Sequence, residues 1–472
     1  MLALYACITK TETEHPKLKG YIGVSTTNTN YFAFSDGSPY IPIGINMVGP
    51  DKYPEGYPDS AFVEIEGWMK NLSANGGNYI RIWLSHRFWD IEESAGVYSQ
   101  DKAERIDRFI SLARKYKLRI KITLEHFRSI TLEENNQPWA TKFIYHRSRG
   151  GKLDSVRQYL ASGEGRKLFL DKLDFYKRRY GADTLFFGWE LWNEMNAMKG
   201  PEDSVFFSWN VDMLKAVKER FPENLVMQSL GSFDTESVRP LYQKMMRLPG
   251  NEVAQVHRYL DPGAPMPVCH ESMDIIGSSA VEELLSYNLN KPVLLAETGA
   301  VEAYHAGPSR YYKVDTTGIM LHDILFAPFF SGAAGTGMSW HWDSYVAKNN
   351  LWFHYKRFNE VVKGIDPILE RFDHSVVITP ELRIYRLKGK NTQLLWLRDK
   401  TSTWQSELAD HQKPRQLSTI ILTHEDIGLL NPRPVQAYDP WNDRWIEIQE
   451  KDGYYPIPSF QRSIIIKTIL EN

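Results

Sequence analysis

The feature of the sequence that most constrains its fold is a repeated alternation of short apolar runs and amphipathic stretches. Eight apolar runs have the length and the β-branched or aromatic character of strands; they span residues 40–46, 78–83, 118–124, 185–192, 224–228, 253–256, 292–296 and 337–340. Stretches with helical periodicity lie between them. In residues 102–116, for example, Ile106, Phe109, Ile110 and Ala113 recur at i, i+3, i+4 and i+7. This alternation predicts βα units and a parallel sheet.

Eight such units across about 320 residues predict an α/β fold, a closed (β/α)8 TIM barrel. The competing arrangement is an open doubly wound sheet, but no glycine-rich dinucleotide loop follows the first predicted strand. Between the third and fourth strands, residues 126–180 exceed a plain βα unit. We expect an insertion there to form one wall of the active face, because loops after barrel strands build that face.

After Pro367 the pattern changes to short alternating runs separated by turn residues. These runs span residues 375–378, 382–385, 393–397, 445–448 and 463–466. They predict an antiparallel β-sandwich. We therefore divide the chain into an export or tether segment (1–30), a catalytic barrel (31–367) and an accessory β-sandwich (368–472). A short strand pair near residues 31–34 either closes the barrel floor or belongs to the second domain.

Composition narrows the function classes. The 472 residues exceed what one hydrophobic core usually holds, so two domains are expected. A net charge of −2 without a basic block argues against a nucleic-acid partner. The 14 Trp residues either fill the core or stack on flat sugar rings. With only Cys7 and Cys269, a disulfide framework and a cysteine-rich metal site are both excluded.

An apolar run at the amino terminus ends at Leu4-Tyr-Ala-Cys7, and these four residues have the form of a bacterial lipoprotein cleavage box. This pattern predicts an exported protein, periplasmic or outer-membrane, with a lipid anchor at Cys7. The alternative is a disordered start with a chance cysteine, because a basic region and a longer apolar run are absent. No run approaches the ~20 apolar residues needed to span a bilayer, so we expect no membrane span.

The chemistry is predicted at the ends of two strands. The fourth predicted strand runs into Asn193-Glu194, and Glu297 follows the seventh. The carboxyl ends of barrel strands are where catalytic groups lie, so these two carboxylates can face each other across a substrate. Glycoside hydrolysis needs this pair, one carboxylic acid to protonate the leaving oxygen and one carboxylate at the sugar's reacting carbon.

This pattern resembles the retaining glycoside hydrolases of clan A, such as families 5 and 2, over residues 31–365. The resemblance implies Glu194 as acid/base and Glu297 as nucleophile. It also implies six accessory positions, which are Arg81, His126, Asn193, His257, Tyr259 and Trp340. In that pattern the arginine supports the nucleophile, the tyrosine hydroxyl bonds it, the asparagine holds the sugar 2-hydroxyl and the tryptophan floors the subsite.

Three further positions have two interpretations each. Trp342 and Asp343, after the eighth strand, either contact sugar or serve the local fold, Asp343 as a loop cap. We expect Glu190, deeper in the barrel, to be a buried partner of Arg81 or Lys121 and not a catalyst. The negative charge of a nearby nucleophile is expected to raise the pKa of Glu194, and Arg81 and Tyr259 to keep Glu297 ionised.

These observations predict a retaining hydrolase of β-glycosidic bonds in a plant-type oligosaccharide or polysaccharide, mannoside- or glucoside-like. The long insertion favours exo action, with endo action and a non-catalytic sugar-binding barrel as alternatives. Arg128 and Arg147 in that insertion could instead recognise an acidic sugar, so a substrate that contains uronate is a further alternative. No cofactor or metal is expected, since no His-x-His pair marks a metal-dependent barrel hydrolase. The C-terminal domain is expected to be a structural partner, although Trp396, Trp404, Trp441 and Trp445 leave a sugar-binding module open.

Overall fold

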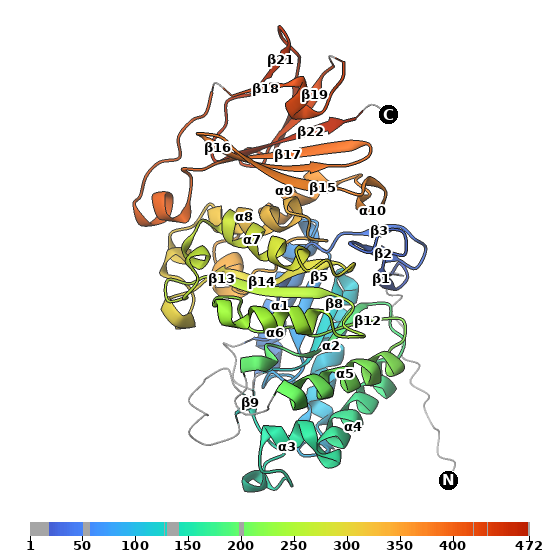
Figure 1. The fold of residues 1–472 in the computed structure, drawn as a ribbon. Helices are drawn as coiled ribbons and strands as arrows, with labels where there is room; N and C mark the ends of the chain where they lie inside the picture. The colour runs from blue at the N-terminus through green and yellow to red at the C-terminus, as the bar shows by residue number, and fades with distance from the viewer. Residues whose placement is uncertain are drawn as a thin grey trace, which may run out of the picture.

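The computed structural model describes residues 18–50, 57–126, 128–129, 141–197, 203–418, 420–431 and 433–470. Cys7 and Trp139 lie outside these ranges. An α/β part carries a smaller β part on its flank (Figure 1). Within the described ranges, no helix has the length and apolar character needed to cross a bilayer.

The α/β part is built on parallel strands, as predicted. Five of them pair in the order β12-β11-β8-β5-β4, and β13 pairs with β14. Their bounds are β4 (Gly44–Asn46), β5 (Tyr79–Trp83), β8 (Arg119–Glu125), β11 (Phe186–Trp192), β12 (Leu225–Met227), β13 (Ala254–Leu260) and β14 (Val293–Ala300). Ser339 bridges Ile45 of β4 and Thr298 of β14, so the two groups form one array. The carboxyl ends of all these strands therefore point to one face.

Two predicted strands are shorter than expected. The eighth, at residues 337–340, pairs only through Ser339, because a π-helical turn begins at Trp342. The first splits into β3 (Pro39–Tyr40) and β4. Pro42, which lacks an amide hydrogen, lies between them.

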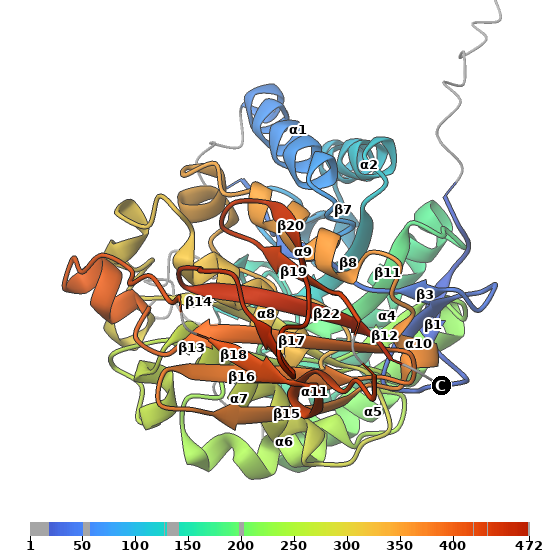
Figure 2. The same cartoon turned by 90° about the horizontal axis from the view of Figure 1, so that it is seen from above.

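Helices cover the outer face of the parallel strands (Figure 2). They are α1 (Pro58–Ala74), α2 (Gln100–Lys115), α3 (Val156–Ala161), α4 (Gly163–Tyr180), α5 (Asp203–Arg220), α6 (Arg239–Met246), α7 (Met273–Leu285), α8 (Ile319–Phe330) and α9 (Phe353–Val362). In α2 three residues of the predicted apolar stripe, Ile106, Phe109 and Ala113, are buried, and the fourth, Ile110, is partly buried. Since α8 is buried along its whole length, it separates the strands from the second domain.

The amino-terminal strands close the floor of the α/β part. The strands β1 (Ile22–Val24), β2 (Phe32–Phe34) and β3 form a small antiparallel sheet. The Phe32 ring packs edge-on against Phe187 with centroids 5.0 Å apart, and Tyr79 contacts the same ring. Because Tyr79 and Phe187 lie at the amino ends of β5 and β11, the first of the two expected placements is confirmed.

The C-terminal domain is a six-stranded antiparallel sheet in the order β15-β16-β17-β22-β19-β20. The bounds are β15 (Asp373–Ile378), β16 (Leu382–Lys388), β17 (Thr392–Asp399), β19 (Val435–Asp439), β20 (Arg444–Ile448) and β22 (Ser463–Ile469). One face is covered by only a two-stranded sheet, β18 (Ile421–Thr423) with β21 (Tyr454–Pro456). The opposite face lies on α8 and α9, so the second layer of the expected sandwich is small.

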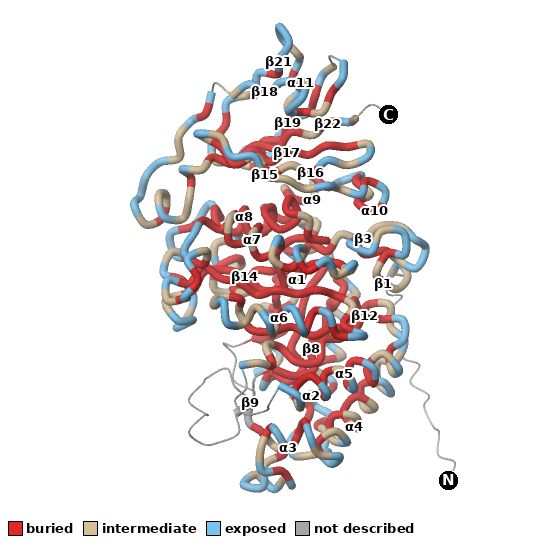
Figure 3. The backbone as a smooth tube through the Cα atoms, in the orientation of Figure 1, coloured by how far each residue is buried: buried red, intermediate tan, exposed pale blue. Residues whose placement is uncertain are grey.

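Buried aromatic and ionic contacts join the domains. The buried Trp396 ring contacts Phe326 and Phe330 of α8. Arg398 of β17 makes a two-pronged ion pair with Asp323 of α8 at 2.9 and 3.0 Å. Burial continues without a break from α8 into β17 and β22 (Figure 3). The domain is therefore packed on the α/β part as the structural partner expected from the sequence.

Candidate active site

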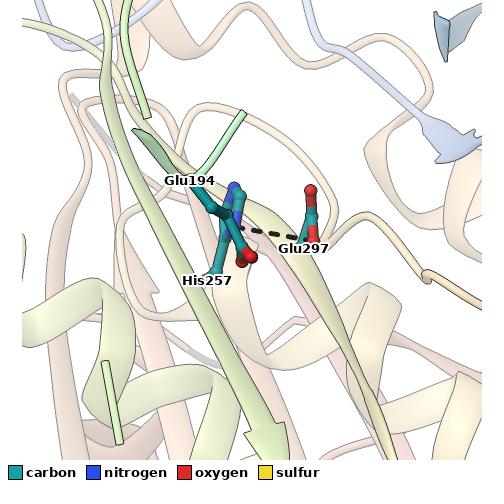
Figure 4. A group of neighbouring side chains, drawn as sticks. All are labelled: Glu194, His257 and Glu297. Atoms are coloured by element: carbon teal, nitrogen blue, oxygen red, sulfur yellow. Dashed lines mark hydrogen bonds and ion pairs between the residues drawn. The ribbon is translucent and has the colours of Figure 1, made fainter. Parts of the chain in front are cut away.

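Glu194, His257 and Glu297 meet at the carboxyl ends of β11, β13 and β14 (Figure 4). Glu297 lies inside β14, which extends to Ala300, beyond its predicted end at residue 296. His257 is its register partner on β13. Glu194 follows β11 with φ of +50°, a left-handed conformation that is rare and strained for a residue with a side chain. This turn brings its carboxyl group towards the other two.

The two carboxyl groups are close. One oxygen of Glu194, one oxygen of Glu297 and Nδ1 of His257 lie within 4.8 Å of one another. Retaining glycosidases hold their two carboxyl groups about 5–5.5 Å apart, whereas inverting ones need about 6.5–9.5 Å to admit a water. The nearest oxygens of this pair are therefore closer together than the longer range requires.

Glu297 is held by two donors. Arg81 forms an ion pair with Oε1, and the Tyr259 hydroxyl donates to Oε2 at 2.9 Å. The side chain is only 3% exposed, and its burial raises the pKa of the carboxyl group. Arg81 and the Tyr259 hydrogen bond oppose that rise. Both predicted contacts of the nucleophile position are therefore present.

The pKa of Glu194 is raised more strongly than that of Glu297. Burial raises its pKa well above the ordinary range, and the charge of Glu297 raises it further. No donor comparable to Arg81 bonds its carboxyl group among the described residues, and its side chain is 25% exposed. Glu194 thus keeps its proton at a pH where Glu297 has lost its own, and remains accessible to a substrate.

His257 stands between the two carboxyl groups. Its Nδ1 lies 2.8 Å from Oε1 of Glu194 and 3.5 Å from Oε2 of Glu297. Burial, together with the charge of Arg81, holds the pKa of His257 well below its usual value. The imidazole is therefore neutral. Its Nε2 is buried without a hydrogen-bond partner among the described residues.

Arg81 organises the layer beneath. Its guanidinium bonds Asn193 Oδ1 at 2.6 Å and Glu190 at 2.9 Å. Lys121 also pairs with Glu190, at 3.1 Å. The interpretation of Glu190 as a buried partner of Arg81 and Lys121 is confirmed. The bond to Asn193 orients the amide so that its nitrogen remains to donate to a ligand.

The aromatic residues form a second wall. Trp340 is partly exposed, and its ring lies 4.9 Å from that of Trp83. Trp342 is buried edge-on against Trp68 of α1 and against Trp340, so it supports Trp340 from behind. Asp343 lies inside the turn that spans Trp342–Ala347 and accepts the amide of the next residue, Ser344.

His126 is fully buried, not exposed to a substrate. Its ring stacks on Trp83 at 4.8 Å and its Nδ1 lies 2.6 Å from the Ser85 hydroxyl. The expected sugar contact is replaced by support of the Trp83 ring. Trp83 contacts both Trp340 and His126, so it belongs to this wall.

Sequence reasoning missed Asn46. At the end of β4, its amide nitrogen donates to the Ala296 and Met338 carbonyls at 3.2 and 3.0 Å, and its Oδ1 accepts from Arg81 at 3.3 Å. It therefore ties β4, β14 and the Ser339 segment to the arginine. A polar residue ending an apolar strand was the available signal.

The three grouped ligand atoms do not favour a cation. The guanidinium of Arg81 is bonded to Glu297 and places a positive charge at the position a metal would have to share. The arrangement instead supplies one protonated carboxyl group, one carboxylate held by Arg81 and Tyr259, and a neutral imidazole between them. That set fits acid-assisted displacement at a carbon between them.

Comparison with known proteins agrees with this geometry. The sequence matches the family described as Cellulase (glycosyl hydrolase family 5) over residues 53–320, more than half of the chain. A search of curated proteins gave no match.

Solved structures share the fold at low identity. One glycoside hydrolase has 13% identity and a TM-score of 0.62, covering 96% of this chain and 97% of that one. A family 5 glycoside hydrolase from Bacteroides vulgatus has 12% identity and a TM-score of 0.60, covering 96% and 94%. The endo-β-1,4-mannanase of Thermotoga petrophila has 14% identity and a TM-score of 0.50, covering 93% and 99%.

Proposed function

Because the chain belongs to glycosyl hydrolase family 5 and is a glycoside hydrolase, we propose that it cleaves β-glycosidic bonds with retention of configuration. The observation that carries this proposal is the short separation of the Glu194 and Glu297 carboxyl groups. One oxygen of each lies within 4.8 Å of the other. This spacing is below the range of about 6.5–9.5 Å that inverting enzymes need to admit a water, which supports direct attack by the carboxylate.

In the first step Glu297 attacks the anomeric carbon while Glu194 gives its proton to the leaving oxygen. The C–O bond to the leaving group breaks and an ester to Glu297 forms. The negative charge of Glu297 helps to raise the pKa of Glu194, and esterification removes that charge. That pKa then falls, so Glu194 can take a proton from water. The water oxygen attacks the anomeric carbon, the bond from that carbon to Glu297 breaks, and the sugar leaves with Glu297 again a carboxylate.

We also propose that the parallel strands close into the (β/α)8 barrel that the family implies. Among the described strands, β12 and β13 are the neighbours that are not joined by strand pairing. There the Glu252 amide donates to the Val226 carbonyl at 3.0 Å, and the Phe233 amide donates to the His257 carbonyl at 2.7 Å. These two bonds support closure at that junction.

For the substrate we propose a β-mannoside or β-glucoside in a plant-type glycan, with exo action. The long segment between β8 and β11 supports exo action, because a bulky loop at a strand end tends to narrow the opening. Arg147 is paired with Asp154 at 2.6 Å, which weakens the argument for an acidic sugar. The Arg128 side chain lies outside the described residues.

The proposal is tested by a screen of aryl β-glycosides with wild type, Glu297→Ala and Glu194→Ala, and with Glu447→Ala on β20 as a control. We expect one glycoside to be turned over. Glu297→Ala should lose that activity. Glu194→Ala should keep a part of it with a good leaving group, because such a group needs little protonation. Proton NMR of the first-formed anomer should show retention.

Four outcomes would contradict parts of the proposal. An inverted first product would exclude the covalent step. Full activity of Glu297→Ala would exclude it as nucleophile. Turnover of oligosaccharides only, from internal bonds, would replace exo by endo action, and binding without any turnover would indicate a sugar-binding protein.

A further inference from the structure

A second group of polar side chains lies at the same strand ends. Asp234 follows β12, Asp261 follows β13, and Tyr304 with His305 follows β14 in a 3-10 turn. The preceding residue of Asp234, Phe233, donates its amide to the carbonyl of His257 at 2.7 Å. The group is therefore adjacent to the imidazole that faces both catalytic carboxyl groups.

The side chains of this group face one another. Nε2 of His305 lies 3.5 Å from Oδ2 of Asp261 and 3.9 Å from Oδ2 of Asp234. The His305 ring also packs edge-on against Tyr259, with centroids 5.1 Å apart. Since Tyr259 bonds Glu297, only one side chain separates His305 from the nucleophile position.

Asp261 is the fixed member. It is 2% exposed, and its Oδ1 accepts the amides of Gly263 and Tyr304 at 2.8 and 2.9 Å. Its Oδ2 has only the His305 contact among the described residues. Burying a carboxylate is costly unless its oxygens are bonded, so this oxygen is a ready acceptor for a ligand hydroxyl.

Tyr304 adds an aromatic face. Its side chain is 81% exposed, although its backbone has φ of +60°. The ring lies over Gly263, where a Cβ would come within 2.8 Å of it. Such a conformation is unfavourable for a tyrosine and persists only when its surroundings enforce it. Here the bond to Asp261 and the fit on Gly263 hold an exposed ring at the edge of the site.

The composition of this group matches a sugar ring. An exposed aromatic ring offers a surface for C–H groups, while carboxylate oxygens and an imidazole bond hydroxyls. Phe233, next to Asp234, donates its amide to the carbonyl of His257 at 2.7 Å. Nδ1 of His257 lies 2.8 Å from Glu194, so Asp234 lies on the side of the acid. The acid protonates the leaving oxygen, which places the leaving group on its side.

We propose that Tyr304, Asp234 and His305 form the subsite for the leaving-group sugar, an inference that rests on the proposed function. Asp261 positions Tyr304 and contributes an acceptor. Because the subsite carries two carboxylates, the sugar it takes is neutral, and a uronate is repelled there. The natural bond is then one between two sugars, not one to an aryl or alkyl group.

The test compares two substrates with the same reacting sugar. β-Mannosyl fluoride has a leaving group too small to reach the subsite, whereas β-1,4-mannobiose places a sugar there. Wild type, Tyr304→Ala, Tyr304→Phe and Asp234→Asn are compared, with Tyr454→Ala as a control. Tyr454 is a 47% exposed tyrosine on β21 of the C-terminal domain. If the aryl glycoside screen shows that the enzyme prefers glucosides, β-glucosyl fluoride and the corresponding glucose disaccharide replace the two mannosyl substrates.

We expect kcat/KM for mannobiose to fall about tenfold or more in Tyr304→Ala and Asp234→Asn. The first variant loses a stacking contact with the sugar, and the second loses a hydrogen bond from the sugar to a charged group. The same variants should stay within about twofold of wild type on the fluoride, because that substrate makes no contact with the subsite. Tyr304→Phe keeps the ring and should retain most of the mannobiose activity. Tyr454→Ala should change neither substrate.

Other outcomes overturn the inference in separate ways. Equal losses on both substrates, or none on mannobiose, would exclude this group as the leaving-group subsite. Mannobiose activity that EDTA abolishes and Zn²⁺ restores in wild type, but not in Asp234→Asn, would assign the group to a cation instead. A wild type inactive on every fluoride and disaccharide would contradict the proposed function itself.

Discussion

Nδ1 of His257 lies 2.8 Å from Oε1 of Glu194 and also faces Glu297. Because burial keeps the imidazole neutral, it carries a single proton, and it bonds Glu194 as acceptor or donor according to the ring tautomer. His257 thus holds the Glu194 carboxyl group in place while that group changes protonation. We regard it as a positioning residue of the acid/base.

His257→Phe keeps the volume of the ring and removes this bond. A hydrogen bond between two neutral groups contributes about 0.5–1.5 kcal/mol, so kcat/KM on a disaccharide should fall about 2- to 13-fold. Activity on a glycosyl fluoride should fall much less in its first step, because fluoride needs no proton from Glu194. Equal losses on both substrates would show that His257 does not act through Glu194.

The pKa of Glu194 should fall when Glu297 is neutralised. In Glu297→Gln the repulsion that raises this pKa disappears, but burial, the larger cause, remains. We therefore expect a value lower than in wild type and still above the ordinary range for Glu. Carbon-13 NMR titration of the labelled carboxyl group measures it. An unchanged pKa would mean that the two groups do not interact.

Arg81 should affect stability and activity separately. Arg81→Met leaves Glu190 with Lys121 as its remaining cation, and removing one member of a buried pair costs about 3–5 kcal/mol. Adding Glu190→Gln should restore part of the lost unfolding free energy without restoring kcat/KM, since Glu297 still lacks its arginine. Denaturant unfolding and kinetics on the same samples check both. Recovery of activity in the double variant would contradict this account.

The domain contact should depend on pH in Arg398→Met. Burial raises the pKa of Asp323 to about 6, even though Arg398 opposes the rise. Without Arg398 the folded-state pKa rises further. A raised folded pKa gives stability that is complete below the unfolded pKa and is lost as pH rises through the folded value. The variant should therefore lose more stability, relative to wild type, at pH 7.5 than at pH 5.

Thermal unfolding of both proteins at the two pH values measures this difference. A deficit independent of pH would show that Asp323 does not titrate at the domain contact. Asp443→Asn is the control, because it removes a more exposed ion pair across the same domain contact, with Lys356 of α9, and it should show little effect at either pH.

The sequence predicted the elements better than their ends. Local periodicity was sufficient for α2, for the parallel strands and for most of the C-terminal strands. It missed β19, whose alternation is interrupted by polar residues, and placed Glu297 after a strand that in fact continues through it. Strand ends depend on neighbouring strands, since pairing with β13 extends β14 to Ala300.

In the candidate site, too, some residues could be predicted from local sequence and others could not. Glu194 and Glu297 follow from a carboxylate after an apolar run, which is a local signal. The arrangement of Asp234, His305 and Tyr304 has no local signal, because their segments are joined only through β12, β13 and β14. The burial of His126 and Trp342 likewise depends on packing against Trp83 and Trp68.

By itself the sequence determined the strand–helix alternation and the positions of the two carboxylates, because apolar spacing and chain direction are properties of neighbouring residues. Only the tertiary structure decided the separation of those carboxylates, the left-handed turn at Glu194 and the difference between their pKa values. These depend on burial and on charges brought together from distant segments, as Arg81 is brought to Glu297. Such interactions act through space, and the chain must fold before they exist.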